Sequence, residues 1–137
     1  MVKYGLRLMI CWLAGMSLSA QPRIAISYPT DEAKVVFGEN IRGTLAGSSG
    51  KAHVHILVKP LRDPNYYVQQ PPSDAASGKW ETVFYCGNKE GGGIGERFRV
   101  FAIVTADELR ERQALGALPA DAVKSGSVQA ITVTRVK

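Results

Sequence analysis

The glycine-rich stretch YCGNKEGGGIGERFRVF, from Tyr85 to Phe101, is the first feature of the sequence that suggests chemistry. Backbone N–H groups in such a stretch can surround a phosphate when the glycines have set spacings and a helix follows. Here Glu96 or Phe98 stands where a G-x-G-x-x-G fingerprint needs its last glycine, and the residues that follow resemble a strand. The stretch is therefore predicted to be a flexible turn between two strands, not a nucleotide site.

Two histidines stand two residues apart in the stretch AHVHILVKP. Successive side chains of a strand alternate between its faces, so His53 and His55 project from the same face and together can chelate zinc or copper. A structural zinc site needs about four ligands and a catalytic one about three, and the chain has no third histidine. A solvent-facing strand edge is the favoured interpretation, and a metal site at His53 and His55 is kept as an alternative.

No catalytic constellation is apparent in the sequence. Cys86 shares a predicted strand face with Trp80 and Phe84, which favours a buried apolar residue over a reactive thiol. A blue-copper site is not expected, because it needs two histidines and usually an axial ligand near the cysteine, and no His or Met follows Cys86. The stretch AGSSGK has the wrong spacing for a nucleophile elbow. We therefore expect no enzymatic activity and no cofactor.

Aromatic residues are the remaining candidates for recognition. Tyr66 and Tyr67 lie with Gln69 in the polar, proline-rich connection LRDPNYYVQQPPSDAASG, and Tyr85 begins the glycine-rich stretch. Tyrosine rings can stack on sugars or anchor a protein partner. The alternative is that one tyrosine fixes the connection to the body of the domain. We take Tyr66, Tyr67, Gln69 and Tyr85 as the candidate binding residues.

The elements that must position these residues are predicted to be short strands. Segments rich in β-branched and aromatic residues recur about every ten residues and are separated by glycine and proline. This spacing predicts an all-β fold, a single antiparallel β-sandwich of seven or eight strands. One short helix is expected before the last strand, with a capping box at Thr105 and Glu108 and an end near Gly116.

The N-terminus resembles an export signal. Lys3 and Arg7 precede the apolar run LMICWLAGMSL, which is shorter than the roughly 20 residues of a membrane span. Small residues at its end favour cleavage after Ser19. We expect a signal peptide over 1–19, a mature domain over 20–137, a periplasmic or secreted location and no stable membrane insertion after cleavage. An uncleaved signal anchor is the alternative.

Composition and charge narrow the class of partner. The chain has 137 residues, of which 45% are hydrophobic and 21% charged, as expected of one globular domain. Loss of the signal lowers Lys+Arg from 17 to 15 while Asp+Glu stays at 12, so the net charge falls from +5 to +3. The basic residues are dispersed, so a nucleic-acid partner is not expected.

A set of motifs along the mature chain resembles a known group of domains. The motifs are I-x-G-x-x-A-G at Ile41–Gly47, HILVKP at His55–Pro60, YYVQ at Tyr66–Gln69, GKW at Gly78–Trp80, FYCG at Phe84–Gly87, GERFRVFAIVT at Gly95–Thr105 and VTRV at Val133–Val136. In this order they resemble bacterial immunoglobulin-like β-sandwich domains of exported and membrane-associated proteins. The resemblance implies that fold and a binding or spacer module without shared catalytic residues.

The sequence therefore predicts an exported, non-catalytic binding or structural module. Its expected partner is another envelope or extracellular protein, recognised through an exposed sheet edge or through the connection at Tyr66–Gln69. One alternative is a carbohydrate-binding module that uses the tyrosines on a glycan. The other is a metal-binding periplasmic protein that uses His53 and His55.

Overall fold

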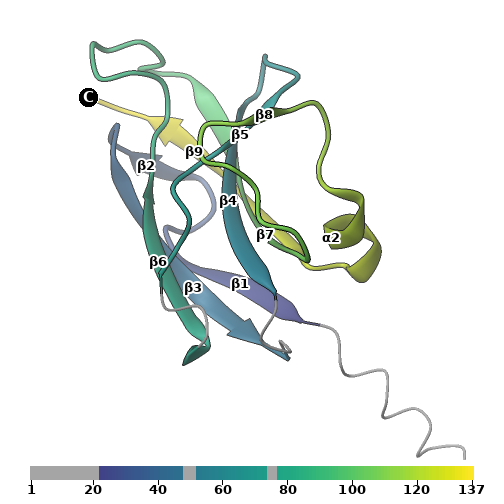
Figure 1. The fold of residues 1–137 in the computed structure, drawn as a ribbon. Helices are drawn as coiled ribbons and strands as arrows, with labels where there is room; N and C mark the ends of the chain where they lie inside the picture. The colour runs from purple at the N-terminus through teal and green to yellow at the C-terminus, as the bar shows by residue number, and fades with distance from the viewer. Residues whose placement is uncertain (1–21, 48–51, 74–76) are drawn as a thin grey trace, which may run out of the picture.

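The computed structural model describes residues 22–47, 52–73 and 77–137, so the signal peptide predicted over 1–19 lies outside the described residues. The described part of the chain forms nine strands and one short helix (Figure 1). In chain order these are β1 (Arg23–Tyr28), β2 (Ala33–Val35), β3 (Glu39–Ala46), β4 (His53–Pro60), β5 (Tyr66–Val68), β6 (Lys79–Phe84), β7 (Arg97–Thr105), β8 (Ala114–Leu115), α2 (Ala120–Ser125) and β9 (Val128–Arg135).

Two sheets form the body of the molecule (Figure 1). The smaller sheet has the strand order β1-β3-β6, and the larger has the order β2-β9-β7-β4-β5-β8. The predicted all-β class is confirmed. The described strands number nine instead of seven or eight, and the two-residue β8 lies in the segment that was predicted to be helical. One pair also differs from the antiparallel prediction, since β2 runs parallel to β9.

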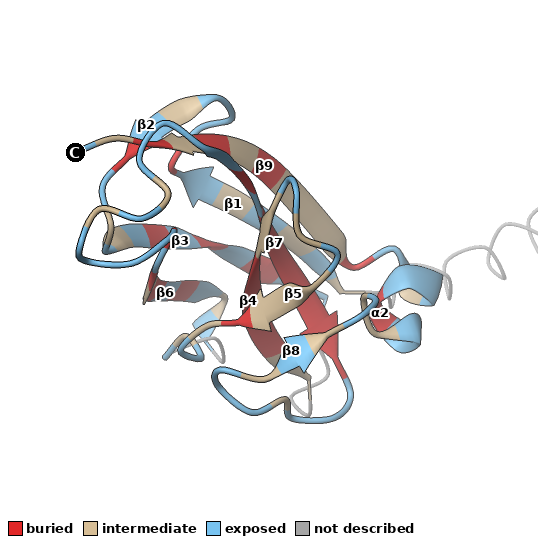
Figure 2. Ribbon diagram, turned by 90° about the horizontal axis from the view of Figure 1, so that it is seen from above, coloured by how far each residue is buried: buried red, intermediate tan, exposed pale blue. Residues whose placement is uncertain are grey.

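The larger sheet carries an apolar cluster on each face. Its strands β4 and β7 are largely buried (Figure 2). Val54, Ile56 and Val58 of β4 lie in a core shared with the smaller sheet, whereas Leu57 lies on the opposite face in a second apolar cluster. This second cluster is closed by side chains from the segment that follows β7, including Leu109. The alternation of side chains predicted for the stretch AHVHILVKP is therefore confirmed, and β7 lies inside the larger sheet, between β9 and β4.

The helix predicted between Thr105 and Gly116 is wrong. Thr105 is the buried last residue of β7, and its hydroxyl donates a 2.6 Å hydrogen bond to the carbonyl of Asp107 instead of capping a helix. The N–H of Leu109 donates to the ring of His55 in β4. Groups from other strands thus accept hydrogen bonds from N–H groups that a helix would have used internally. These contacts outweigh the helix propensity of the segment.

The one helix of the described residues, α2, begins later, after Pro119. It ends at Gly126, whose left-handed φ of 71° and N–H bond to the carbonyl of Val123 close the last turn. A short helix before the last strand is therefore present, but in a different segment from the predicted one. No helix within the described ranges is long and apolar enough to cross a membrane.

The glycine-rich loop between β6 and β7 is organised by a buried arginine of β9. Arg135 is only 4% exposed, and its Nη1 donates to the carbonyls of Cys86 at 2.6 Å, Asn88 at 3.0 Å and Gly92 at 3.3 Å. Asn88 closes the loop further, since its Oδ1 accepts the N–H of Gly92 at 2.7 Å. The loop leads into a strand as predicted, but these hydrogen bonds hold it in place where the sequence indicated a flexible turn.

Trp80 is the largest fully buried side chain, and it lies against a position that has no side chain. A Cβ at Gly43 would come within 2.3 Å of the Trp80 ring and within 1.9 Å of the carbonyl oxygen of Ala25. The indole N–H donates to the carbonyl of Thr44 at 3.1 Å. The glycine of the I-x-G motif is therefore required for packing the tryptophan of β6 onto β3.

We expect Gly43→Ala to lower the free energy of unfolding by about 1–3 kcal/mol, because the added methyl group overpacks the core. Gly116→Ala is the matched control, since nothing lies within 4 Å of a Cβ there. Urea unfolding of both variants measures the difference. Equal stability of the two variants would contradict the packing described for Trp80.

Candidate functional site

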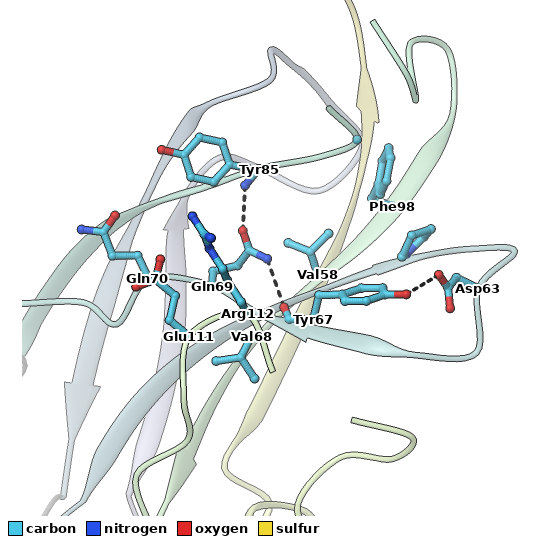
Figure 3. A pocket seen from close by; sticks show the side chains of 12 residues that line it. Val58, Asp63, Tyr67, Val68, Gln69, Gln70, Tyr85, Phe98, Glu111 and Arg112 are labelled. Atoms are coloured by element: carbon cyan, nitrogen blue, oxygen red, sulfur yellow. Dashed lines mark hydrogen bonds between the residues drawn. The ribbon is translucent and has the colours of Figure 1, made fainter. Parts of the chain in front are cut away.

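A pocket of about 440 Å³ opens where the chain crosses from β5 in the larger sheet to β6 in the smaller one (Figure 3). Three of the four candidate binding residues, Tyr67, Gln69 and Tyr85, line this pocket. Val58 and Phe98 contribute apolar wall from β4 and β7. Residues that are far apart in the sequence therefore meet at one concave site.

Gln69 ties the two sides of the pocket together (Figure 3). Its Oε1 accepts the N–H of Tyr85 at 2.9 Å, and its Nε2 donates to the carbonyl of Tyr67 at 3.1 Å. Its own backbone N–H donates to the carbonyl of Ile56 at 2.8 Å. Because both ends of the carboxamide are engaged by the protein, Gln69 is a positioning residue of the pocket.

Tyr67 is fixed by an acidic residue at one end of the pocket (Figure 3). The hydroxyl of Tyr67 donates to Oδ2 of Asp63 at 2.7 Å, and the N–H of Asn65 donates to Oδ1 at 2.9 Å. Both hydrogen bonds hold the pKa of Asp63 below its usual value, and the bond from the Asn65 N–H has the larger effect. The same contact with Asp63 raises the pKa of Tyr67. Near neutral pH the site therefore holds an ionised carboxylate beside a protonated tyrosine.

Tyr85 forms an exposed part of the pocket wall. Its side chain follows β6 and is 43% exposed. The ring is supported from one side by Phe37, at 4.9 Å between ring centroids. Gly38 adds to this support, since a Cβ there would lie 3.1 Å from the Tyr85 ring. The ring is thus held in place while much of its surface stays accessible to a partner.

Tyr66 does not belong to this group. Its ring packs edge-on against Phe101 of β7, with 5.2 Å between centroids, in the second apolar cluster on the far face of the larger sheet. Adjacent residues of a strand point to opposite faces, which explains why Tyr66 and Tyr67 separate. Tyr66 therefore has the anchoring role that the sequence left open for one tyrosine.

Glu111 and Arg112 complete the pocket and were not identified from the sequence. They come from the segment after β7 that was predicted to be helical. Arg112 has a left-handed φ of 72°, which places it in a tight turn beside β5. No sequence signal marks such a conformation for an arginine, because glycine or asparagine is the usual residue there.

His55 is buried and not part of a solvent-facing edge, because the segment after β7 covers that face of β4. Only 1% of the residue is exposed, and its Nε2 accepts the N–H of Leu109 at 3.1 Å. Its Nδ1 has no hydrogen-bond partner among the described residues. The His53 and His55 rings stack with 6.2 Å between centroids.

The metal hypothesis receives no support from further ligands. No group of three or more His, Cys, Asp or Glu residues that could hold a metal ion occurs within the described ranges. The Nε2 lone pair of His55 is already used by Leu109. Two imidazoles alone are fewer than the three protein ligands of a catalytic zinc site. Metal binding at His53 and His55 stays a hypothesis.

Cys86 is buried beside the glycine-rich loop, as the sequence predicted. Burial raises the pKa of its thiol to about 12, although the neighbouring Arg135 guanidinium acts in the opposite direction. A thiol with this pKa stays protonated near neutral pH and is a poor nucleophile. Cys86 therefore acts as a small apolar residue of the core.

Comparison with known proteins adds no family to this description: no protein-family model matches the chain, and no curated protein matches it. The resemblance to immunoglobulin-like domains therefore stays a prediction from the sequence motifs.

Acidification is expected to destabilise the protein through His55. Burial, followed by repulsion from His53, lowers the pKa of His55 below the usual 6.5. Between the folded and unfolded pKa values the unfolded chain binds more protons, so the stability contributed by neutral His55 is present above pH 6.5 and declines below it. Thermal unfolding at several pH values between about 8 and 5 measures this decline. His55→Phe should show a shallower decline over that range, and an unchanged slope would contradict this role.

Gln69→Ala is expected to remove two side-chain hydrogen bonds and to lower the free energy of unfolding by about 1–2 kcal/mol. Gln70→Ala is the matched control, because the Gln70 side chain makes no hydrogen bond among the described residues. Chemical denaturation of the two variants tests the difference. Equal losses would show that the Gln69 carboxamide does not hold the pocket together.

Proposed function

We propose that this chain is an exported, non-catalytic binding module with an immunoglobulin-like sandwich, which recognises another envelope or extracellular protein. One observation carries the proposal. Tyr67 in β5 of the larger sheet and Tyr85, directly after β6 of the smaller sheet, line one open pocket of about 440 Å³. The resemblance of the sequence motifs and the two-sheet, all-β architecture are both compatible with such a module.

The chemistry of the pocket suits a protein partner. Tyrosine and arginine are enriched at the energetic centres of protein interfaces, where apolar walls surround them. The pocket combines Tyr67, Tyr85 and Arg112 with the apolar wall of Val58 and Phe98. A single side chain of a partner, seated against this wall, would bury apolar surface of the larger sheet.

The titratable groups at the pocket favour binding over catalysis. Among the described residues that line it, none is His, Cys, Ser or Lys, and the carboxylate of Asp63 is held by Tyr67 and Asn65. Its pKa is lowered, so near neutral pH it is a poor general acid or base.

A glycan is the second candidate ligand. Two tyrosine rings stand beside Asp63, Gln70 and Arg112, and this mixture of stacking surfaces with hydrogen-bond donors and acceptors also suits a polyhydroxylated ligand. The same site would serve either ligand, so the nature of the captured molecule decides between them.

Site-specific photo-crosslinking in the native host tests the proposal. A photoreactive phenylalanine analogue at Tyr85 should yield a defined protein adduct, and the adduct should be lost when Tyr67→Ala is added. The same analogue at Val123, an exposed residue of α2 outside the pocket, is the control and should not give that adduct.

Identical adducts from both positions would contradict a binding site at the pocket. If the analogue at Tyr85 gives no protein adduct, and if the protein binds a glycan array in a way that Tyr67→Ala abolishes, the ligand is a glycan and not a protein.

A further inference from the structure

The turn that carries Arg112 is fixed by backbone hydrogen bonds to β5. The N–H of Arg112 donates to the carbonyl of Val68 at 2.8 Å, and the N–H of Val68 donates to the carbonyl of Gln113 at 2.9 Å. The turn closes on itself, since the N–H of Gln113 donates to the carbonyl of Arg110 at 3.1 Å. The Cα of Arg112 is therefore held at a set place on the pocket wall.

The backbone conformation of Arg112 favours glycine, yet the position holds a long cationic side chain. Its φ of 72° lies in the left-handed region, where a β-carbon is unfavourable. Strained residues of this kind are enriched at functional sites. The folded backbone alone therefore gives no reason for an arginine at this position.

The guanidinium of Arg112 has no partner of its own within the described part of the chain. Among the other arginines, Arg97 pairs with Glu32 at 2.7 Å and Arg135 binds loop carbonyls, whereas Arg23, Arg62 and Arg110 make no ion pair or side-chain hydrogen bond with a described residue. Arg112 makes no ion pair or side-chain hydrogen bond with a described residue, its neighbour Glu111 included. Among the described arginines it alone lines the pocket, so this cation is available to a ligand.

The charges at the two ends of the pocket differ in availability. The side chain of Arg112 points toward the Tyr85 end, whereas Asp63 lies at the opposite end (Figure 3). Asp63 already accepts hydrogen bonds from Tyr67 and Asn65, while Arg112 is uncommitted. An anionic group of a ligand therefore has a free, forked donor in Arg112 and a satisfied carboxylate in Asp63, while the carboxylate of Glu111 also lines the pocket.

We propose that Arg112 determines the specificity of the pocket by binding a carboxylate of a partner peptide, while an adjacent apolar side chain of that peptide packs on Val58 and Phe98. A guanidinium pairs with a carboxylate through two parallel hydrogen bonds, which a lysine cannot reproduce. The net charge of +3 predicted for the chain after loss of the signal also favours association with an acidic segment. This inference rests on the proposed function of the pocket as a protein-binding site.

Peptide arrays with matched amides test the inference on the protein purified from the exported fraction. One array presents Asp or Glu beside Leu or Phe, and its match replaces the acids by Asn or Gln. A second pair of arrays presents peptides that have no Asp or Glu, with free C-termini in one array and amidated C-termini in the other. This pair distinguishes recognition of a terminal carboxylate from recognition of a side-chain carboxylate. In at least one of these two comparisons, we expect the peptide with the carboxylate to bind at least about tenfold more tightly than its amide match. This gain is typical of hydrogen bonds to a charged group.

Variants at and near the turn assign this preference to Arg112. Arg112→Gln should abolish the acid preference, and Arg112→Lys should restore only part of it. Arg112→Gly should also abolish it while leaving the melting temperature unchanged or higher, because glycine suits the left-handed backbone. Arg110→Gln removes the same charge from the same turn outside the pocket and should keep the preference.

Different failures have different meanings. Tight binding that is equal for acidic and amidated peptides, or an acid preference that survives Arg112→Gln, would overturn the role of Arg112 and leave the protein-binding function standing. Binding to polygalacturonate with no binding to any peptide would overturn both, in favour of a glycan. Binding to neither probe would also overturn the inference.

Discussion

The packing of the Trp80 indole on the bare backbone of Gly43 is the contact on which the rest of the structure depends. It places β6 beside β3 and fills the core that the smaller sheet shares with β4 and β7 of the larger sheet. Tyr85 follows β6 directly, so the position of this strand also decides where Tyr85 leaves the sheet. The geometry of the pocket is thus a consequence of how the core is packed.

The pocket is assembled from three parts of the chain that no single element could bring together. Gln69 bridges the crossing from β5 to β6 through hydrogen bonds to Tyr67 and Tyr85. The segment after β7 folds back over the larger sheet, where His55 and β5 capture its N–H groups, and this return brings Arg112 to the pocket. The segment that His55 holds on one face of β4 is therefore the same segment that supplies Arg112 to the pocket wall.

Local patterns in the sequence predicted much of this fold but only part of the site. The period of two placed Trp80, Phe84 and Cys86 on one buried apolar face, and glycine and proline marked the turns. The helix predicted after Thr105 failed because pairing with β5 and His55 outweighed a capping box. The carbonyl contacts of Arg135 and the left-handed turn of Arg112 depend on contacts between distant segments, so no local pattern could predict them.

Hydrogen–deuterium exchange tests whether the tyrosine pocket is the partner-binding site that we propose. Exchange is measured on the protein alone and on its complex with the partner that co-purifies from the exported fraction. We expect slower exchange at Tyr66–Gln70, Tyr85 and 110–113 on binding, and unchanged exchange in α2. Slower exchange confined to α2 or to the edge strand β1, with the pocket segments unchanged, would contradict this proposal.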